Sequence, residues 1–182
     1  MVVFDSSVLL LILDLNAKPP TDPATGQPVY KAAERIKYLI KNLAAYKEKI
    51  VIPTPVLSEV LVYAGEAMLP YLNILNRQAA FRIAPFDQKA AIEAALAMSD
   101  AIKRGGHRVD AANPDTTKTK IKFDRQIVAI AKAEGAQAVY SDDADVHSYA
   151  KHAGLDAYRT ADLNIPPEYP QQSLEFETDD LD

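Results

Sequence analysis

The chain of 182 residues contains no cysteine and only three histidines. Without cysteine it has no disulfide framework, no thiolate metal site and no thiol nucleophile. A zinc site is also poorly supplied, because His147 and His152 are five residues apart and do not share the i, i+4 face of a helical zinc-binding pair. Carboxylates and hydroxyls are therefore the main groups left for a catalytic or metal-binding site.

Several other sequence signals are missing as well. Gly105 and Gly106 follow no strand and lack the Gly-Lys-Ser/Thr that cradles phosphates, and no serine lies in a nucleophile elbow. The N-terminus has no basic region, and the apolar run over residues 8–13 is far shorter than the roughly 20 residues of a membrane span. We therefore expect a cytoplasmic protein that does not enter a membrane.

Charge is unevenly distributed along the chain. The net charge is −5, but residues 168–182 hold six acidic residues and no basic one, so the rest of the chain sums to +1. Residues 101–123 carry a local +4, from Lys103, Arg104, Arg108, Lys118, Lys120 and Lys122 against two aspartates. A basic patch beside acidic residues suits an enzyme acting on a polyanion, although a solvated loop explains the same charges equally well. We expect one domain over residues 1–165 and an acidic, extended or disordered tail over residues 166–182.

Predicted strands and helices alternate along the chain. Short apolar runs indicate strands at residues 2–4, 50–52, 81–84, 138–140 and 157–159, and residues 8–15 a short helix or continuation. Apolar repeats and capping signals predict helices over residues 29–43, from Thr54, and over 68–76, 88–103, 125–134 and 145–153, with connections at 16–28 and 105–122. The residues expected to face inward from the helix at 88–103 are Ala91, Ala94, Ala95, Met98 and Ile102. This alternation is typical of a three-layer α/β/α fold with a central, mainly parallel sheet.

Four acidic residues lie where the chain otherwise reads as apolar strand or helix. Asp5 ends the first strand, Asp124 opens a helix, Asp143 follows the fourth strand, and Glu59 lies among apolar helical residues. Each alone has an ordinary explanation, since the aspartates could cap helices or lie in turns and Glu59 could be exposed. Together they favour a shared site, because a parallel sheet brings the carboxyl ends of its strands to one edge.

Clustered carboxylates repel one another unless a cation lies between them. Mg²⁺ and Mn²⁺ prefer oxygen ligands of this kind. One or two such ions could activate a water, bind a phosphate oxygen and stabilise the leaving oxygen of a phosphodiester. The four acids therefore predict a Mg²⁺- or Mn²⁺-dependent site whose chemistry is phosphodiester hydrolysis.

Four segments that carry these acids follow one another at characteristic spacing. They are Val3-Phe4-Asp5-Ser6-Ser7, the stretch from Ile52 to Val60 with Glu59, the stretch from Phe123 to Ala131 with Asp124, and the stretch from Val139 to Asp145 with Ser141, Asp142 and Asp143. Each is weakly specific alone, but in this order they resemble the motifs of PIN-domain ribonucleases, particularly the toxins of VapBC-type toxin–antitoxin systems. The resemblance covers most of residues 1–160 and leaves out the acidic tail, and the loops at 16–28 and 105–122 make the chain longer than a minimal toxin of that type.

The resemblance implies a PIN-like fold and a nuclease domain over residues 1–165. The metal-binding and catalytic residues would be Asp5, Glu59, Asp124 and Asp143, with Asp145 as an accessory ligand and Ser7, Ser141 and Asp142 in support. Because Asp142 and Asp143 are adjacent, the choice between them is open, and we favour Asp143. The RNA backbone would be held by Lys118, Lys120, Lys122 and Arg125. A type II toxin of this kind would also have an antitoxin partner and would form a homodimer.

Two other functions fit parts of the sequence. A PIN-like scaffold that binds RNA or a protein without cutting it would keep the fold and dispense with the metal. A phosphatase that uses Asp5 as a covalent nucleophile would need a second aspartate two residues on, where this chain has Ser7. The complete set of acids argues against the scaffold, and Ser7 argues against the phosphatase.

Overall fold

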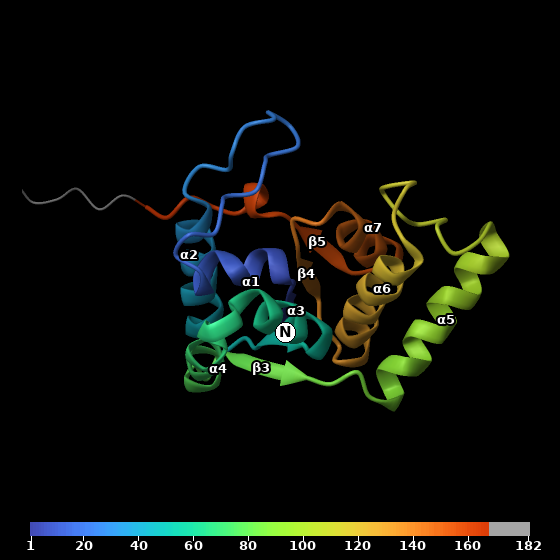
Figure 1. Ribbon diagram of the computed structural model, residues 1–182, viewed down its shortest axis with the longest axis horizontal. Helices are drawn as coiled ribbons and strands as arrows, with labels where there is room; N and C mark the ends of the chain where they lie inside the picture. Colours follow the sequence, from blue (N-terminus) through green and yellow to red (C-terminus); the bar gives the residue numbers. More distant parts are fainter. Residues whose placement is uncertain (168–182) are drawn as a thin grey trace, which may run out of the picture.

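Five parallel strands form the central sheet, in the order β3-β2-β1-β4-β5 (Figure 1). This computed structural model describes residues 1–167. The strands are β1 (Val2–Phe4), β2 (Ile50–Pro53), β3 (Phe81–Ala84), β4 (Ala138–Tyr140) and β5 (Asp156–Tyr158). Every neighbouring pair runs parallel, so the predicted α/β class is confirmed and the sheet is wholly rather than mainly parallel.

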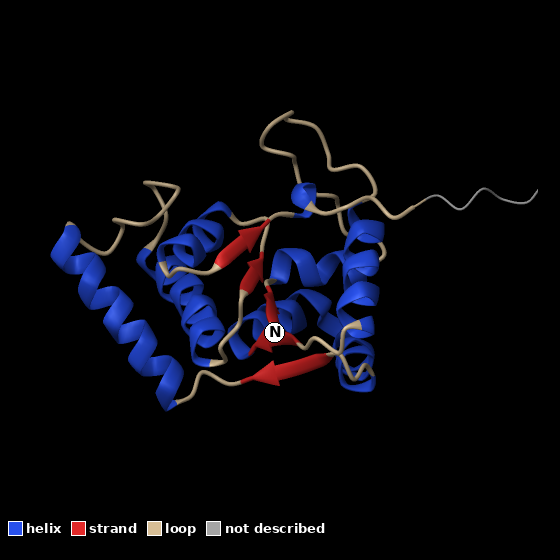
Figure 2. Cartoon of the chain, turned by 180° about the vertical axis from the view of Figure 1, so that it is seen from behind, coloured by secondary structure: helices blue, strands red, loops and turns tan. Residues whose placement is uncertain are grey.

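Helices flank the sheet on both faces (Figure 2). They are α1 (Ser6–Leu13), α2 (Ala32–Ala45), α3 (Thr54–Ala64), α4 (Met68–Arg77), α5 (Gln88–Arg104), α6 (Lys118–Ala133) and α7 (Ala144–His152), with the short turns η1 (Gly65–Ala67) and η2 (Thr160–Asp162). Side chains of a strand point alternately to opposite faces. In β1, Val2 and Phe4 therefore pack with residues of α1 and α2, while Val3 packs with residues of α3, α6 and α7.

The sheet has a switch point between β1 and β4. From β1 the chain moves to β2 and β3 on one side and then crosses to β4 and β5 on the other. In open parallel sheets of this kind, a crevice opens outside the carboxyl ends of the two strands at which the order reverses. The residues that follow β1 and β4 are therefore placed side by side at the edge where a ligand would bind.

Helix α6 begins at Lys118, seven residues before the start predicted from the sequence at 125. The Thr117 hydroxyl oxygen accepts a hydrogen bond from the backbone N–H of Lys120 (3.2 Å) and so caps the helix. The lysine-rich end of the predicted connection is consequently the first turn of α6. The basic side chains there project from a helix with a fixed spacing and not from a flexible loop.

Helix α5 is less buried than the sequence predicted. Only Ala90 and Ala101 are buried in it, while Ala94 and Met98 are partly buried and Ala91, Ala95 and Ile102 are exposed. Among the regular elements its main contact is with α6, and Figure 1 shows it at the outer side of α6, away from the sheet. The apolar repeat predicted the helix correctly, but less of its face is covered than a core helix would have.

The loop, the tail and the absence of a membrane span were also predicted from the sequence. The proline-rich stretch at residues 16–28 is a loop, closed by a bridge between Thr21 and Pro28. The acidic tail predicted for residues 166–182 lies, from residue 168 onward, outside the described residues. Within residues 1–167, no helix is long and apolar enough to cross a membrane.

Candidate metal centre

Asp5 and the Ser141–Asp143 turn meet at the switch point of the sheet. Phe4 pairs with Tyr140 in the strand register, and the backbone N–H of Asp5 donates to the Tyr140 carbonyl (3.0 Å). The next residue of each strand is therefore brought to the same place. The Ser141 hydroxyl donates to the Asp5 carboxylate at 2.7 Å, across 136 positions of sequence.

The Asp5 carboxylate is buried and directed into the site. Asp5 is the N-cap residue of α1, but its carboxylate makes no capping hydrogen bond. It accepts hydrogen bonds from the hydroxyls of Ser141 and Ser7 (3.1 Å) instead. Burial raises the pKa of Asp5 above its ordinary value, against the lowering effect of hydrogen bonds from Ser141, from the Ser6 backbone and from Ser7, and the nearby charge of Glu59 raises it further. A cation bound nearby would stabilise the charged form of this buried carboxylate.

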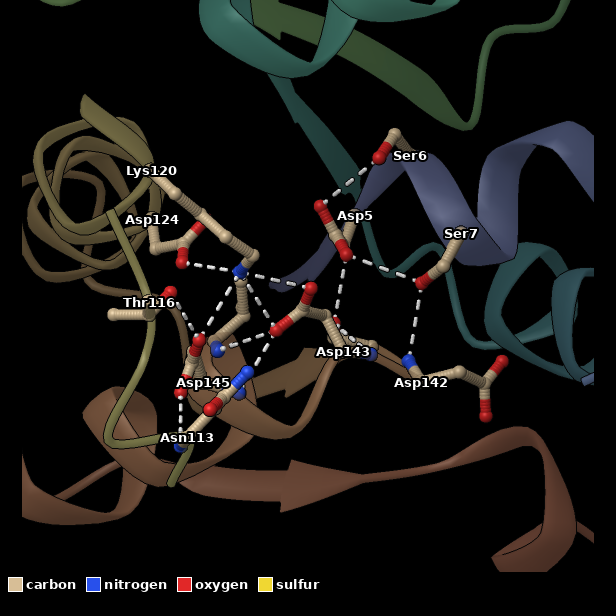
Figure 3. A network of polar contacts seen from close by, with 12 residues as sticks. Asp5, Ser6, Ser7, Asn113, Thr116, Lys120, Asp124, Asp142, Asp143 and Asp145 are labelled. Atoms are coloured by element: carbon tan, nitrogen blue, oxygen red, sulfur yellow. Dashed lines mark hydrogen bonds and ion pairs between the residues drawn. The ribbon is translucent and has the colours of Figure 1, made fainter. Parts of the chain in front are cut away.

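A tighter cluster of three carboxylates lies beside Asp5. Oxygens of Asp124 on α6, Asp143 before α7 and Asp145 on α7 lie within 4.8 Å of one another. The ammonium of Lys120 reaches all three, at 2.6 Å from Asp124, 2.9 Å from Asp143 and 3.3 Å from Asp145 (Figure 3). The cluster thus already holds one positive charge, which offsets the repulsion among the acids.

The two acids at the start of α7 are fixed by neutral donors. Asp143 caps the helix and accepts from the backbone N–H groups of Asp145 (2.8 Å) and Val146 (3.3 Å). Asp145 accepts from the Asn113 backbone N–H (2.9 Å) and the Thr116 hydroxyl (2.9 Å). Burial acts to raise the pKa of Asp145, but these hydrogen bonds and the Lys120 charge outweigh it and hold the pKa below the ordinary value. Asp145 is therefore an oriented carboxylate that stays ionised.

Asp124 has the opposite balance. Burial raises the pKa of Asp124 to about 6, against the lowering effect of Lys120 and with an added upward push from the charges of Asp143 and Asp5. The repulsion shows that Asp5 and the three-carboxylate cluster share one electrostatic environment. A divalent ion bound among them would relieve that repulsion and lower the pKa again.

A cavity of about 520 Å³ joins these groups. Its polar lining includes Asp5, Glu59, Lys120, Asp124 and Asp143. Its apolar lining includes Pro55, Val62, Phe123, Ile127 and Val146. The four acids predicted from the sequence as catalytic thus line a single cavity at the carboxyl edge of the sheet, and Asp145 contacts the same lysine.

The pair Asp142 and Asp143 is separated by the geometry. The Asp142 carboxylate accepts from the backbone N–H (2.9 Å) and hydroxyl (2.5 Å) of Thr160 and points away from the cluster (Figure 3). Its backbone N–H is held by the Ser7 hydroxyl (3.0 Å). Asp143 lines the cavity, whereas Asp142 anchors η2 after β5, and the choice of Asp143 as a metal ligand stays a prediction.

Glu59 and the predicted RNA contacts lie in four different settings. Glu59 is exposed at the cavity wall formed by α3, so its apolar sequence neighbours do not bury it. Lys118 and Lys122 are exposed and line a separate cavity between α5 and α6. Lys120 lies in the acidic cluster. Arg125 differs from the expectation: its side chain is buried, bonded to Asp110 (3.2 Å) and stacked on Tyr149, and it lines a separate cavity next to α5 and not the one that holds the acids.

Three residues of the site were not predicted from the sequence. Asn113 and Thr116 hold Asp145 from the connection before α6, and Phe123 forms part of the cavity wall with half of its surface exposed. Nothing in the spacing of Asn113 and Thr116 points to Asp145. A signal did exist for Lys120, because its i, i+4 spacing to Asp124 places both side chains on one face of a helix.

The donor set fits a hard divalent cation. All candidate ligand atoms are carboxylate oxygens, the described residues bring three of them within 4.8 Å, and a cationic side chain already lies among them. Mg²⁺ and Mn²⁺ prefer such oxygen donors and keep some coordinated water, for which the open cavity has room. This group of three aspartates, of which Asp124 and Asp145 are buried, could therefore hold a metal ion.

Comparisons with known proteins identify the fold. No family model matches the chain, and neither does any curated protein sequence. Among solved structures, VapBC2 from Rickettsia felis bound to a promoter DNA fragment matches with TM-score 0.58 and 14% identity, covering 87% of this chain and 98% of that one. VapBC from Salmonella typhimurium bound to DNA matches with TM-score 0.55 and 13% identity, covering 87% and 97%. FitAB bound to an IR36 DNA fragment matches with TM-score 0.51 and 18% identity, covering 91% and 99%.

These similar structures are toxin–antitoxin complexes bound to DNA. The chain matches the PIN-domain toxins of the VapC and FitB type in structure, at low sequence identity, and its fold is PIN-like as the sequence motifs predicted.

Proposed function

We propose that this protein is a Mg²⁺- or Mn²⁺-dependent endoribonuclease that acts as the toxin of a type II toxin–antitoxin pair. The observation that carries the proposal is the convergence of Asp5, Asp124 and Asp143, from three separate parts of the chain, on one cavity at the switch point of the sheet. The PIN-like fold supports it, because the similar structures are toxin–antitoxin complexes.

In this proposal each residue has a defined task. Asp124, Asp143 and the oriented Asp145 would hold the ion, while Asp5 and Glu59, which line the same cavity, would complete or orient its ligand shell. The hydroxyls of Ser7 and Ser141 keep the Asp5 carboxylate turned toward the cavity. A bound Mg²⁺ or Mn²⁺ supplies a Lewis acid for a phosphate oxygen and a source of nucleophilic hydroxide.

Removal of metal should abolish activity. We expect dialysis against EDTA to reduce cleavage of a fluorescent single-stranded RNA to background, and added Mn²⁺ or Mg²⁺ to restore it, because the acids alone offer no strong electrophile for the phosphodiester. Ca²⁺, a larger oxygen-binding ion, serves as the comparison. Cleavage that persists in EDTA would contradict a metal mechanism. RNA binding without cleavage at any metal concentration would instead support the non-cutting scaffold.

The cavity also has features suited to RNA. Phe123 precedes Asp124, is 50% exposed and lines the cavity, so its ring offers a stacking surface for an unpaired base next to the acids. Lys118 and Lys122 lie on the same helix and remain predicted contacts for the RNA backbone. Buried Arg125 is left out of this set.

Substitution of Phe123 should weaken RNA binding. We expect Phe123→Ala to raise the Kd for a single-stranded RNA by about tenfold, since base–aromatic stacking contributes about 1–3 kcal/mol. Fluorescence anisotropy in EDTA measures binding without cleavage. Phe123→Tyr keeps an aromatic ring and should bind as the wild type does, whereas Phe123→Leu keeps only the apolar bulk and should resemble the alanine variant. If all three Phe123 variants bind the RNA as tightly as the wild type does, the ring does not contact a base.

The proposed partners follow from the fold and remain to be tested. An antitoxin is proposed because the similar structures are toxin–antitoxin complexes. A homodimer stays a prediction, and the exposed apolar residues Val62, Tyr63 and Leu69 on α3 and α4 are the surface we propose for it. Analytical ultracentrifugation of the wild type and of Leu69→Asp would test this contact.

A further inference from the structure

The ammonium of Lys120 lies where a metal ion bound to the three-carboxylate cluster would lie. It donates hydrogen bonds to Asp124 (2.6 Å) and Asp143 (3.1 Å) and forms an ion pair with Asp145 at 3.3 Å. The same three residues are the described group whose oxygens lie close enough together for one ion. In Figure 3 the ammonium is the point at which the contacts of the cluster converge.

The helix fixes this placement. Thr117 caps α6 and sets its first turn, and Lys120 then lies one turn before Asp124, on the face that lines the site. Lys118 and Lys122, two residues to either side, line the separate cavity between α5 and α6. Three lysines in five residues thus have two different environments, and only one of them contacts the acids.

A divalent ion on this cluster and the ammonium would compete for the same three carboxylates. The Oδ2 atoms of Asp124, Asp143 and Asp145 each lie within 3.3 Å of the Lys120 nitrogen. A Mg²⁺ ion binds oxygen at about 2.0–2.1 Å, so it could not share the position of the ammonium. An ion and an ammonium bound to the same three carboxylates would also repel each other strongly.

We propose that Lys120 is a resident counter-ion of the metal centre, and that metal binding is an exchange in which the ion displaces its ammonium from the carboxylates. This inference rests on the proposed function for the existence of the metal ion. The displaced ammonium stays tethered at the cavity through its flexible stem, where it is placed to bind a phosphate oxygen of the RNA. One lysine thereby neutralises the acids before the metal arrives and holds substrate afterwards.

The exchange makes metal affinity the decisive measurement. Full-length protein is freed of metal with EDTA, dialysed and titrated with Mn²⁺, with free Mn²⁺ followed by electron paramagnetic resonance. We expect Lys120→Met to bind Mn²⁺ about tenfold more tightly than the wild type, because no ammonium has to be displaced. Lys118→Met and Lys122→Met remove the same charge from the same helix, and they should stay within about twofold of the wild type.

A second readout covers the stability of the variant. Without metal, Lys120→Met should melt at a lower temperature than the wild type, since its acids have lost their counter-ion, and Mn²⁺ should raise its Tm by more than it raises that of the wild type. Lys120→Gln keeps a polar side chain of similar reach, and the same pattern is expected if Lys120→Met does not fold.

The outcomes separate the two proposals. Mn²⁺ binding by Lys120→Met and Lys120→Gln that is equal to or weaker than that of Lys118→Met overturns the exchange and leaves the metal-dependent function standing. Absence of Mn²⁺ binding in the wild type and in every variant overturns the metal-dependent function, and the exchange with it.

Discussion

Asp143→Asn is expected to lower Mn²⁺-dependent RNA cleavage by about a hundredfold or more, whereas the adjacent Asp142→Asn should leave it within about twofold. The Asp143 carboxylate lines the cavity and contacts Lys120, so its charge is available to a metal ion. The Asp142 carboxylate is engaged by the backbone and hydroxyl of Thr160, outside the cluster. Initial rates at saturating Mn²⁺ on the same RNA give the comparison.

The two substitutions are closely matched. Each removes one negative charge without changing the size of the side chain, at neighbouring positions of one turn. Asparagine at 143 can still cap α7 through its carbonyl oxygen, so loss of activity with an unchanged Tm would point to the metal site and not to misfolding. The assignment is reversed if Asp142→Asn is the inactive variant. It fails if both variants keep full activity.

Two simple rules explain why the acids predicted from the sequence line one cavity. Asp5 and Asp143 follow short, buried strands, and parallel strands end at a common edge. Asp124 lies on α6 and is buried, and Glu59 lies on α3 and is exposed. Local patterns therefore predicted both the sheet and the residues at its edge, without any knowledge of distances.

The surroundings of the acids could not be predicted in the same way. Asn113 and Thr116 reach Asp145 across about 30 positions, through a connection whose path depends on tertiary contacts. Arg125 reads as a basic residue next to a catalytic acid, but its buried pairing with Asp110 is visible only once α5, α6 and the connection are packed. Sequence charge indicates which groups are present, whereas folding decides which of them face solvent.

The start of α6 shows a related limit. The first turn of that helix is almost wholly polar, so it gives no apolar repeat, and its cap Thr117 is one of several adjacent hydroxyl residues. On α5 the opposite happened: a clear apolar repeat predicted a core-facing side, but the helix packs mainly on α6 and leaves Ile92, Leu96 and Ile102 at least half exposed. Periodicity identifies a helix more reliably than it identifies the partner that covers it.

Asp110→Asn is expected to lower the free energy of unfolding by about 3 kcal/mol, the cost of leaving a buried cation without its counter-charge. Asp110 is 3% exposed and binds Arg125, which is 7% exposed, at 3.2 Å. The Nε of Arg125 has no hydrogen-bond partner among the described residues, so this guanidinium depends heavily on Asp110. The more exposed Arg104 also donates two hydrogen bonds of 2.7 Å to Asp110, which tie the connection to α5 and whose loss adds to the cost.

Urea unfolding of Asp110→Asn measures this effect. The matched control is Asp115→Asn, at an exposed aspartate on the same connection, whose free energy of unfolding should change by less than about 0.5 kcal/mol.

The pH dependence of stability gives a second test. Hydrogen bonds from Arg104 lower the pKa of Asp110, against the upward effect of burial and with help from Arg125. A carboxylate whose pKa is lowered in the folded state contributes its stability above the unfolded pKa of about 3.9 and loses it as the pH falls through the folded pKa. The difference between wild type and Asp110→Asn should therefore stay constant near neutral pH and shrink below about pH 4. A difference that instead grew in acid would mean that the Asp110 charge destabilises the fold. Because the connection that Asp110 anchors also carries Asn113 and Thr116, the same variant should loosen Asp145 and weaken Mn²⁺ binding, which links the stability of α5 and α6 to the chemistry at the edge of the sheet.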